Sequence, residues 1–349
     1  MKILITGGSG MVGRNLIEKS REFSYEVLTP TRAEMDLLSP LSIHNFLQRN
    51  LPDCIVHCAG LVGGIAANIA NPVEFLSTNA YIGLNLISEC TKIGIKRFLN
   101  LASSCMYPRN APNPLREEMI LQGELEPTNE GYALAKILAA RMCEYITRTQ
   151  NDYLYKTAIP CNLYGKYDKF EPTRAHLIPA AIAKIHKAKE QNLPQVEIWG
   201  DGSARREFMY AEDLADFVFY ALENFEKMPQ NLNVGLGYDY TIDEYYQTIA
   251  KIIGYEGRFY HDTQKPSGMQ QKLIDVTKLH SFGWKAKVTL ESGILETYHY
   301  TTMLGGGGNT SLVALLTHKL LFISIVTQIT KNFKFTHCDQ LQTKETNGI

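Results

Sequence analysis

The sequence lacks an excess of charge of either sign. It contains 35 Lys and Arg residues and 36 Asp and Glu residues, for a formal net charge of -1 over 349 residues. A nucleic-acid-binding domain usually concentrates positive charge, so no nucleic-acid partner is expected. With 45% hydrophobic and 20% charged residues, the composition excludes a disordered or collagen-like chain and is typical of a globular protein.

Cysteine is also sparse, with seven residues and no Cys-x-x-Cys pair. A chain of this length can bury a large core without crosslinks, so reduced thiols are expected rather than a disulfide scaffold. A long apolar run is missing from the N-terminus, where Met1–Thr6 is too short for a signal peptide and glycines follow directly. Together these features predict a cytoplasmic protein, and we assign no metal site.

Short apolar segments alternate with helical patterns through the first half of the chain. The expected strands are Lys2–Thr6, Tyr25–Thr29, Asp53–His57, Arg97–Ala102 and Lys156–Pro160. The expected helices are Met11–Ser20, Pro40–Gln48, Asn79–Lys92 and Gly131–Thr149. This order predicts an α/β fold with a Rossmann-type doubly wound parallel sheet and helices on both faces. Strands that are apolar throughout agree with burial on both sides.

The alternation changes after about residue 162. A charged loop is expected over 167–176, helices over Leu177–Lys189 and Ala211–Glu223, and a strand over Gln195–Trp199. We therefore expect a Rossmann domain over 1–162, to which segments from about 205–240 also contribute. A smaller C-terminal α/β lobe, mainly for substrate binding, is expected over 163–302.

The C-terminal segment breaks the pattern. Gly305–Gly308 has the composition of a flexible linker, and Ser311–Ile329 is largely apolar but contains His318 and Lys319. A membrane helix needs about 20 mainly apolar residues, and the β-branched residues here suit a strand equally well. We interpret 303–349 as an atypical glycine-linked tail and expect no membrane partner.

A glycine-rich segment follows the first expected strand and opens the first helix. It reads Gly7-Gly8-Ser9-Gly10-Met11-Val12-Gly13 and contains both GxGxxG and GxxGxxG. Glycine permits the tight turn and lets backbone N–H groups approach a pyrophosphate at the helix N-terminus, while Gly13 would allow close helix–strand packing. These seven residues are predicted to bind a dinucleotide.

The end of the second expected strand distinguishes NADP from NAD. A carboxylate there would bond the ribose 2′-hydroxyl, but the chain has Thr29-Pro30-Thr31-Arg32. Arg32 could pair with a 2′-phosphate, or it could be a solvated surface residue. The missing acid favours NADP(H) as the cofactor.

Tyr132 and Lys136 form a Tyr-x-x-x-Lys pair on one face of the helix expected over Gly131–Thr149. A nearby ammonium would lower the pKa of the phenol from about 10 and allow proton exchange near neutral pH. Ser103 follows the strand Arg97–Ala102, where a hydroxyl would lie beside the cofactor at the carboxyl edge of the sheet. The three features in this order predict a reductase active site.

Several longer segments extend this pattern. They are His57–Ile65, Leu101–Pro108, Glu126–Lys136, Cys161–Gly165, His176–Ala180, Trp199–Gly202, Arg205–Phe208 and Lys272–Val276. On these segments, which span about residues 1–302, the chain resembles the extended short-chain dehydrogenase/reductases and, among them, the GDP-L-fucose synthase family of epimerase-reductases.

The resemblance implies NADPH-dependent epimerisation at C3 and C5 of GDP-4-keto-6-deoxy-D-mannose, followed by reduction at C4 to GDP-L-fucose. It implies that Cys105 is the epimerisation base and His176 the acid. Tyr132 would donate a proton to the C4 oxygen, Lys136 would hold the nicotinamide ribose, and Ser103 would bond the oxyanion. Further implied cofactor residues are Leu101, Ala102, Lys136, Pro160, Asn162 and His176. Implied substrate residues are Lys184, Trp199, Arg206, Arg258 and Lys272.

Other interpretations stay open. The same chemistry could act on another GDP-4-keto sugar such as a 6-deoxyheptose. A catalytically silent dinucleotide-binding sensor should lack some of Ser103, Tyr132 and Lys136, yet all are present. Cys105 could be a small buried hydrophobe, and His176 a solvent-facing residue at a helix start. A homodimer through the long helices is expected from the resemblance alone.

Overall fold

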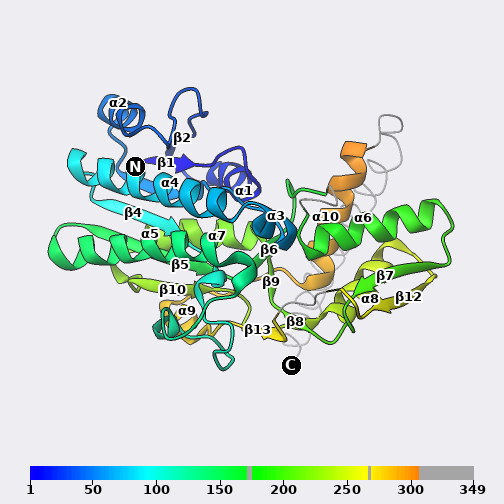
Figure 1. The fold of residues 1–349 in the computed structure, drawn as a ribbon. Helices are drawn as coiled ribbons and strands as arrows, with labels where there is room; N and C mark the ends of the chain where they lie inside the picture. The colour runs from blue at the N-terminus through cyan, green and yellow to red at the C-terminus, as the bar shows by residue number, and fades with distance from the viewer. Residues whose placement is uncertain (171–174, 266–268, 306–349) are drawn as a thin grey trace, which may run out of the picture. The chain divides into compact units, whose positions relative to one another are not determined.

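Six parallel strands form the central sheet in the order β2-β1-β3-β4-β5-β10 (Figure 1). The computed structural model describes residues 1–170, 175–265 and 269–305. The strands of this sheet are β1 (Lys2–Thr6), β2 (Glu26–Leu28), β3 (Cys54–His57), β4 (Arg97–Leu101), β5 (Leu154–Pro160) and β10 (Asn231–Val234). Because β1 pairs with β2 on one side and β3 on the other, the topological switch point lies at the carboxyl end of β1.

Helices cover both faces of this sheet. The helices are α1 (Met11–Ser20), α2 (Pro40–Asn50), α3 (Ile65–Ala70), α4 (Pro72–Ile93), α5 (Glu130–Thr149), α6 (Leu177–Glu190), α7 (Ala211–Glu223), α8 (Ile242–Ile253), α9 (Thr277–Phe282) and α10 (Leu290–Gly305). Alternate strand residues point to opposite faces. Ile3 and Ile5 join a core with residues of α1 and α7, whereas Leu4 and Ile55 join a core with residues of α2, α4 and α5. The predicted fold class is confirmed.

A second core forms in the later part of the chain. Its members include Ile182 of α6, Ile198 of β7, Ile249 of α8 and Ile294 of α10. The shorter strands are β6 (Asn162–Tyr164), β7 (Gln195–Trp199), β8 (Arg205–Arg206), β9 (Phe208–Tyr210), β11 (Tyr240–Thr241), β12 (Arg258–Asp262) and β13 (Gln271–Lys272). They form a β11-β8-β13 sheet and the parallel pairs β7–β12 and β6–β9.

The structure differs from the sequence prediction at the start of α4 and in the helices α3, α8 and α9, which the prediction omits. Helix α4 begins at Pro72, seven residues before the predicted start, and proline suits the first helical position. Helix α8 was not predicted, although Thr241 and Glu244 form a capping box at its start, a signal that the sequence contains.

Residues Met1–Tyr298 form one compact unit, and His299–Ile349 group separately. The predicted boundary near residue 162 therefore stays a prediction. Helix α10 continues to Gly305, and the tail beyond it, with Ser311–Ile329, lies outside the described residues. Among the helices that are described, none has the length and apolar character that crossing a membrane requires.

Candidate active site

The glycine-rich segment joins β1 to α1 and requires glycine at two places. Gly7 has a backbone φ of +73°, and a Cβ there would lie 2.8 Å from the Ala59 Cα. A Cβ on Gly13 would lie 2.2 Å from the Gly7 carbonyl oxygen. No side chain caps the first turn of α1 after Gly10 within the described chain. Its backbone N–H groups therefore face the loop, where a pyrophosphate could accept their hydrogen bonds.

The carboxyl ends of β4 and β5 bring the other predicted cofactor residues to the same edge of the sheet. Leu101 ends β4 and Ala102 follows it, and Pro160 ends the neighbouring β5. Asn162 begins β6, where its amide Nδ2 donates to the Glu207 carbonyl oxygen at 2.9 Å. Neighbouring parallel strands thus place residues from two distant segments at one edge, where doubly wound sheets bind ligands.

Arg32 follows β2 and is largely exposed. Its side chain is 78% exposed, and its Nε lies 3.6 Å from Asp36 Oδ1. Glu34 accepts hydrogen bonds from the backbone N–H and the hydroxyl of Thr31. Two carboxylates therefore lie just beyond the four residues that favoured NADP, and the role of Arg32 stays a prediction.

Tyr132 and Lys136 lie on the first turns of α5. Lys136 is 8% exposed, and its Nζ donates to the Leu101 carbonyl oxygen at 3.0 Å. The same Nζ lies 5.7 Å from the centroid of the Tyr132 ring. The two side chains and the end of β4 therefore meet at one place.

The expected lowering of the Tyr132 pKa is wrong for this structure. Burial raises the pKa of the phenol above 10, and the Cys105 thiolate would raise it further. Burial also lowers the pKa of Lys136, although Cys105 and Cys58 oppose this change. Desolvation is the largest influence on the phenol, so Tyr132 is neutral at neutral pH and carries the proton that an acid must donate.

Ser103 and Cys105 come directly after β4, with Cys105 on a short 3-10 helix, Ser104–Met106. The backbone N–H of Cys105 donates to Ser103 Oγ at 3.4 Å, and Cys105 is 5% exposed. Burial raises the pKa of the Cys105 thiol above its ordinary value. Lys272 is the strongest opposing influence, ahead of the Ser103 hydrogen bond and Lys136. Lys272 is therefore the cation that most favours the thiolate.

His176 lies directly before α6 and is half-buried. Burial lowers its pKa, and the positive charges of Lys169 and Lys272 lower it further. Lys272 thus acts electrostatically on both Cys105 and His176, which are 71 residues apart in sequence. Without a bound anion, His176 is neutral at neutral pH.

The predicted substrate residues fall into separate groups. Trp199 ends β7, is 51% exposed and lies 5.5 Å from the Lys184 Nζ. Arg206 of β8 is in register with Lys272 of β13. Arg258 pairs with Gln195 at the other end of β7, four residues or about 13 Å along the strand from Trp199. The structure therefore brings Trp199 and Lys184 together, and Arg206 and Lys272, but it separates Arg258 from Trp199.

Sequence reasoning missed the buried carboxylate of Glu207. Glu207 is 0% exposed and accepts backbone N–H hydrogen bonds from Leu236 at 2.6 Å, Gly237 at 3.0 Å and Ile274 at 3.0 Å. Burial raises the pKa of Glu207 to about 7. Its place beside Arg206 in sequence was the available signal, but its partners lie 29 or more residues away. Glu207 ties the strand that carries Arg206 to the segment that follows Lys272.

Comparison with known proteins defines the class first. A family model described as NAD dependent epimerase/dehydratase family matches residues 3–235. The chain belongs to this family.

Three of the similar proteins have names that refer to GDP-linked sugars. The chain is 58% identical over 300 residues to the GDP-L-colitose synthase of Yersinia pseudotuberculosis, covering 86% of this chain and 97% of that one. It is 48% identical over 299 residues to the GDP-L-fucose synthase of Azorhizobium caulinodans, covering 86% and 96%. A GDP-mannoheptose C4 reductase from Campylobacter jejuni, solved with NADP bound, has a TM-score of 0.79 and 32% identity over 86% of this chain and 98% of that one. The predicted resemblance is confirmed.

Proposed function

We propose that the protein is an NADPH-dependent epimerase-reductase that converts GDP-4-keto-6-deoxy-D-mannose to GDP-L-fucose. The observation that carries the proposal is the meeting of Tyr132, Lys136 and the end of β4 at the edge of the sheet where the glycine-rich loop also lies. The similarity to GDP-L-fucose and GDP-L-colitose synthases supports the substrate class, and the NADP-bound relative supports the cofactor.

For the reduction, Tyr132 supplies the proton and Lys136 holds the cofactor ribose. NADPH, when bound, supplies the hydride that adds to C4, and it leaves as NADP⁺. The neutral phenol of Tyr132 donates its proton to the C4 oxygen, which completes the alcohol. Ser103 donates a hydrogen bond to the same oxygen while negative charge develops there. The Leu101 carbonyl fixes the Lys136 ammonium, so its position does not depend on the substrate.

For the epimerisation, Cys105 and His176 act on the carbons that flank the ketone. The Cys105 thiolate removes a proton from C3 or C5, and the resulting enolate keeps its charge on the C4 oxygen beside Ser103 and Tyr132. His176 returns a proton to the opposite face of the carbon. The positive charge of Lys272 favours the thiolate and opposes protonation of His176. A diphosphate bound near Lys272 would offset the second effect and favour the imidazolium.

Recognition of GDP follows from the remaining groups. Guanine can stack on the exposed ring of Trp199, beside the ammonium of Lys184. Arg206 and Lys272 lie in register on adjacent strands and supply positive charge for the diphosphate.

A second substrate is favoured by the 58% identity to a GDP-L-colitose synthase. L-Colitose lacks the 3-hydroxyl of L-fucose, so its keto precursor needs inversion at C5 but not at C3. A 6-deoxyheptose precursor stays a third candidate, because a heptose reductase is among the structural relatives.

A substrate panel tests the function. Purified protein and NADPH are incubated in D₂O with GDP-4-keto-6-deoxy-D-mannose, its 3-deoxy analogue or a heptose analogue, and NADPH absorbance and product NMR are followed. We expect NADPH oxidation and deuterium at C5, with inversion at C3 only when the 3-hydroxyl is present. NADPH binding without turnover of any of these substrates would favour the silent sensor instead. The preferred sugar is the one with the highest kcat/KM.

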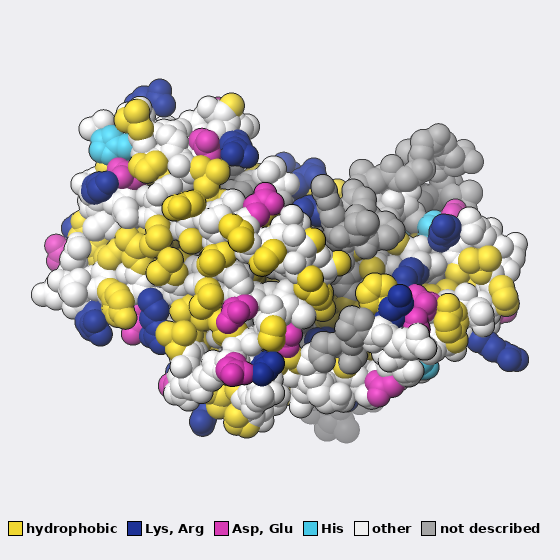
Figure 2. All heavy atoms as spheres, in the orientation of Figure 1, with side chains coloured by type: hydrophobic (Ala, Val, Ile, Leu, Met, Phe, Trp, Pro, Cys, Tyr) yellow, Lys and Arg dark blue, Asp and Glu magenta, His cyan; other side chains and the backbone are white. Residues whose placement is uncertain are grey.

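We further propose a cytoplasmic homodimer that pairs through α4 and α5. Figure 2 shows hydrophobic side chains gathered over these two helices. Tyr81 of α4 is 59% exposed, and Leu134, Leu138 and Tyr145 of α5 are 40%, 43% and 51% exposed. Exposed apolar residues on neighbouring helix faces suit a protein interface. Sedimentation should give a dimer for the wild type and a monomer for Leu138→Glu, while the control Leu41→Glu on α2 stays dimeric.

A further inference from the structure

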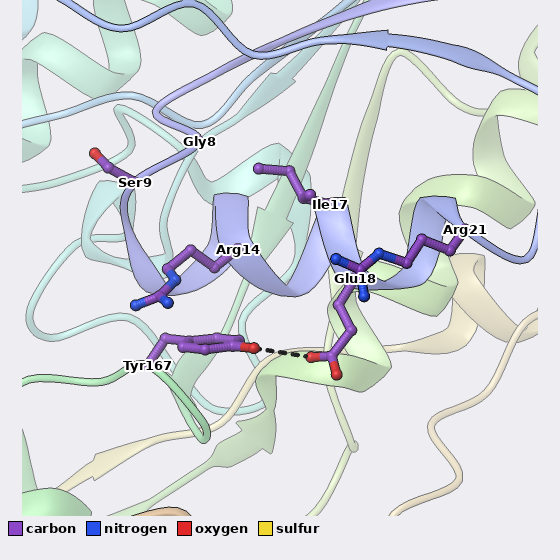
Figure 3. A pocket seen from close by; sticks show the side chains of 7 residues that line it. All are labelled: Gly8, Ser9, Arg14, Ile17, Glu18, Arg21 and Tyr167. Atoms are coloured by element: carbon purple, nitrogen blue, oxygen red, sulfur yellow. Dashed lines mark hydrogen bonds between the residues drawn. The ribbon is translucent and has the colours of Figure 1, made fainter. Parts of the chain in front are cut away.

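A pocket of about 380 Å³ lies along the outer side of α1, next to the glycine-rich loop. It is lined by Gly8, Ser9, Arg14, Ile17, Glu18, Arg21 and Tyr167 (Figure 3). Figure 3 shows Gly8 and Ser9 at one end of the helix and Arg21 at the other, with Arg14 lying over the Tyr167 ring. Gly8 and Ser9 are assigned above to cofactor binding, but Arg14 and Arg21 have no role assigned so far.

Arg14 is exposed, and the described residues give its charge no carboxylate partner. Its guanidinium carbon lies 4.0 Å from the centroid of the Tyr167 ring. In the described part of the chain, neither Arg14 nor Arg21 forms an ion pair. The Glu18 carboxylate of the same pocket accepts a hydrogen bond from the Tyr167 hydroxyl at 3.3 Å. The pocket therefore has an excess of positive charge and suits an anion.

The direction of the Arg14 side chain indicates which kind of anion the pocket would bind. Helical side chains tilt toward the N-terminus of their helix, and Arg14 is the fourth residue of α1. Its guanidinium accordingly leans back toward the Ser9 end, as Figure 3 shows. The backbone N–H groups of the first turn, which suit a phosphate, lie at this same end.

Tyr167 is held in place independently of any ligand. Asn15 is buried, and its Nδ2 donates to the Lys166 carbonyl oxygen at 3.2 Å and to the Met11 carbonyl oxygen at 2.9 Å. Tyr167 itself has a φ of +68°, which a bulky residue adopts only when its surroundings impose it. A fixed ring restricts the rotamers of Arg14 before the anion arrives, so less side-chain entropy is lost on binding.

We propose that Arg14, braced by Tyr167, binds a phosphate of the dinucleotide. This inference rests on the NADP(H) binding proposed above. It adds to Arg32 a second cation, contributed by α1 rather than by the segment after β2. The phosphate is the 2′-phosphate or the pyrophosphate, and the two cofactors distinguish them because only NADPH has the former.

The test measures dissociation constants of NADPH and NADH by fluorescence titration for wild type, Arg14→Gln, Arg14→Lys and Arg21→Gln. We expect Arg14→Gln to weaken NADPH about tenfold, the scale of one hydrogen bond to a charged group. The NADPH affinity of Arg14→Lys should lie between those of wild type and Arg14→Gln, because lysine keeps the charge but loses the planar fork. Arg21→Gln removes the same charge from the far end of α1 and should bind like wild type.

The NADH arm identifies the phosphate. Weaker NADPH binding with unchanged NADH binding assigns Arg14 to the 2′-phosphate, and equal weakening of both assigns it to the pyrophosphate. Wild-type NADPH affinity in Arg14→Gln, or equal losses in Arg14→Gln and Arg21→Gln, would overturn the inference. A wild-type chain that binds neither cofactor would instead refute the proposed function.

Discussion

Replacing Glu207 by Gln should change how the stability of the protein depends on pH. Glu207 is fully buried, and burial raises its pKa from 4.5 to about 7 despite three hydrogen bonds from backbone N–H groups. A raised folded-state pKa means that the protonated acid stabilises the fold. This contribution is complete below pH 4.5 and is lost as the pH rises through 7.

The magnitude follows from these two pKa values. Each tenfold difference in proton affinity corresponds to about 1.4 kcal/mol, so the contribution of Glu207 falls by about 2 to 3 kcal/mol between pH 5 and pH 8. Gln does not titrate, so Glu207→Gln lacks this contribution. Its amide also turns an N–H group toward the N–H of Ile274, which loses its acceptor. That second cost is the same at every pH and cancels when two pH values are compared.

The assay is urea denaturation of both proteins at pH 5, 6, 7 and 8. The free energy of unfolding of Glu207→Gln should lie furthest below that of wild type at pH 5 and approach it by about 2 to 3 kcal/mol at pH 8. Glu256→Gln, at an exposed position, is the matched control and should follow wild type throughout. A difference between Glu207→Gln and wild type that is constant with pH, or larger at pH 8, would refute the reasoning.

Three further predictions concern the site. Gly13→Ala places a Cβ 2.2 Å from the Gly7 carbonyl oxygen, so NADPH binding measured by titration should weaken more than tenfold, and near wild-type binding would contradict the tight loop. Cys105→Ser should abolish solvent deuterium exchange at C3 and C5 while NADPH still binds, whereas Tyr132→Phe should block reduction but leave exchange measurable by NMR; wild-type turnover in both would refute the roles. Lys272→Met should raise the pKa of the Cys105 thiol further, because the positive charge of Lys272 lowers it. The pH profile of Cys105 alkylation by iodoacetamide should then shift to higher pH. An unchanged profile would contradict an electrostatic effect of Lys272 on Cys105.

Local sequence patterns predicted much of the fold. The bounds of β1, α1, β7 and α7 agree with the prediction because apolar periodicity and glycine positions act within a few residues. The sequence contains the capping signal of helix α8, Thr241 and Glu244, although the prediction omits this helix. Helix α4 was predicted too short because its first turns expose apolar residues such as Val73 and do not show a regular buried face.

The sequence predicted which residues form the candidate site, but it did not predict the directions of their pKa shifts. The expectation that an ammonium lowers the pKa of Tyr132 followed from helical spacing, which places Lys136 nearby. The structure reverses the direction because the phenol is desolvated, and desolvation depends on everything that packs around it. The thiol of Cys105 has its pKa raised for the same reason.

By itself the amino-acid order determined the alternation of strands and helices, the glycine turn and the pairing of Tyr132 with Lys136, because each depends on neighbours within a turn or a strand. Only the tertiary structure decided that Lys272 acts on Cys105, that Glu207 lies buried among three backbone donors, and that Tyr167 lies beneath Arg14. These contacts join residues 29 to 167 positions apart, and burial, which sets the pKa of each group, exists only once those segments have packed together.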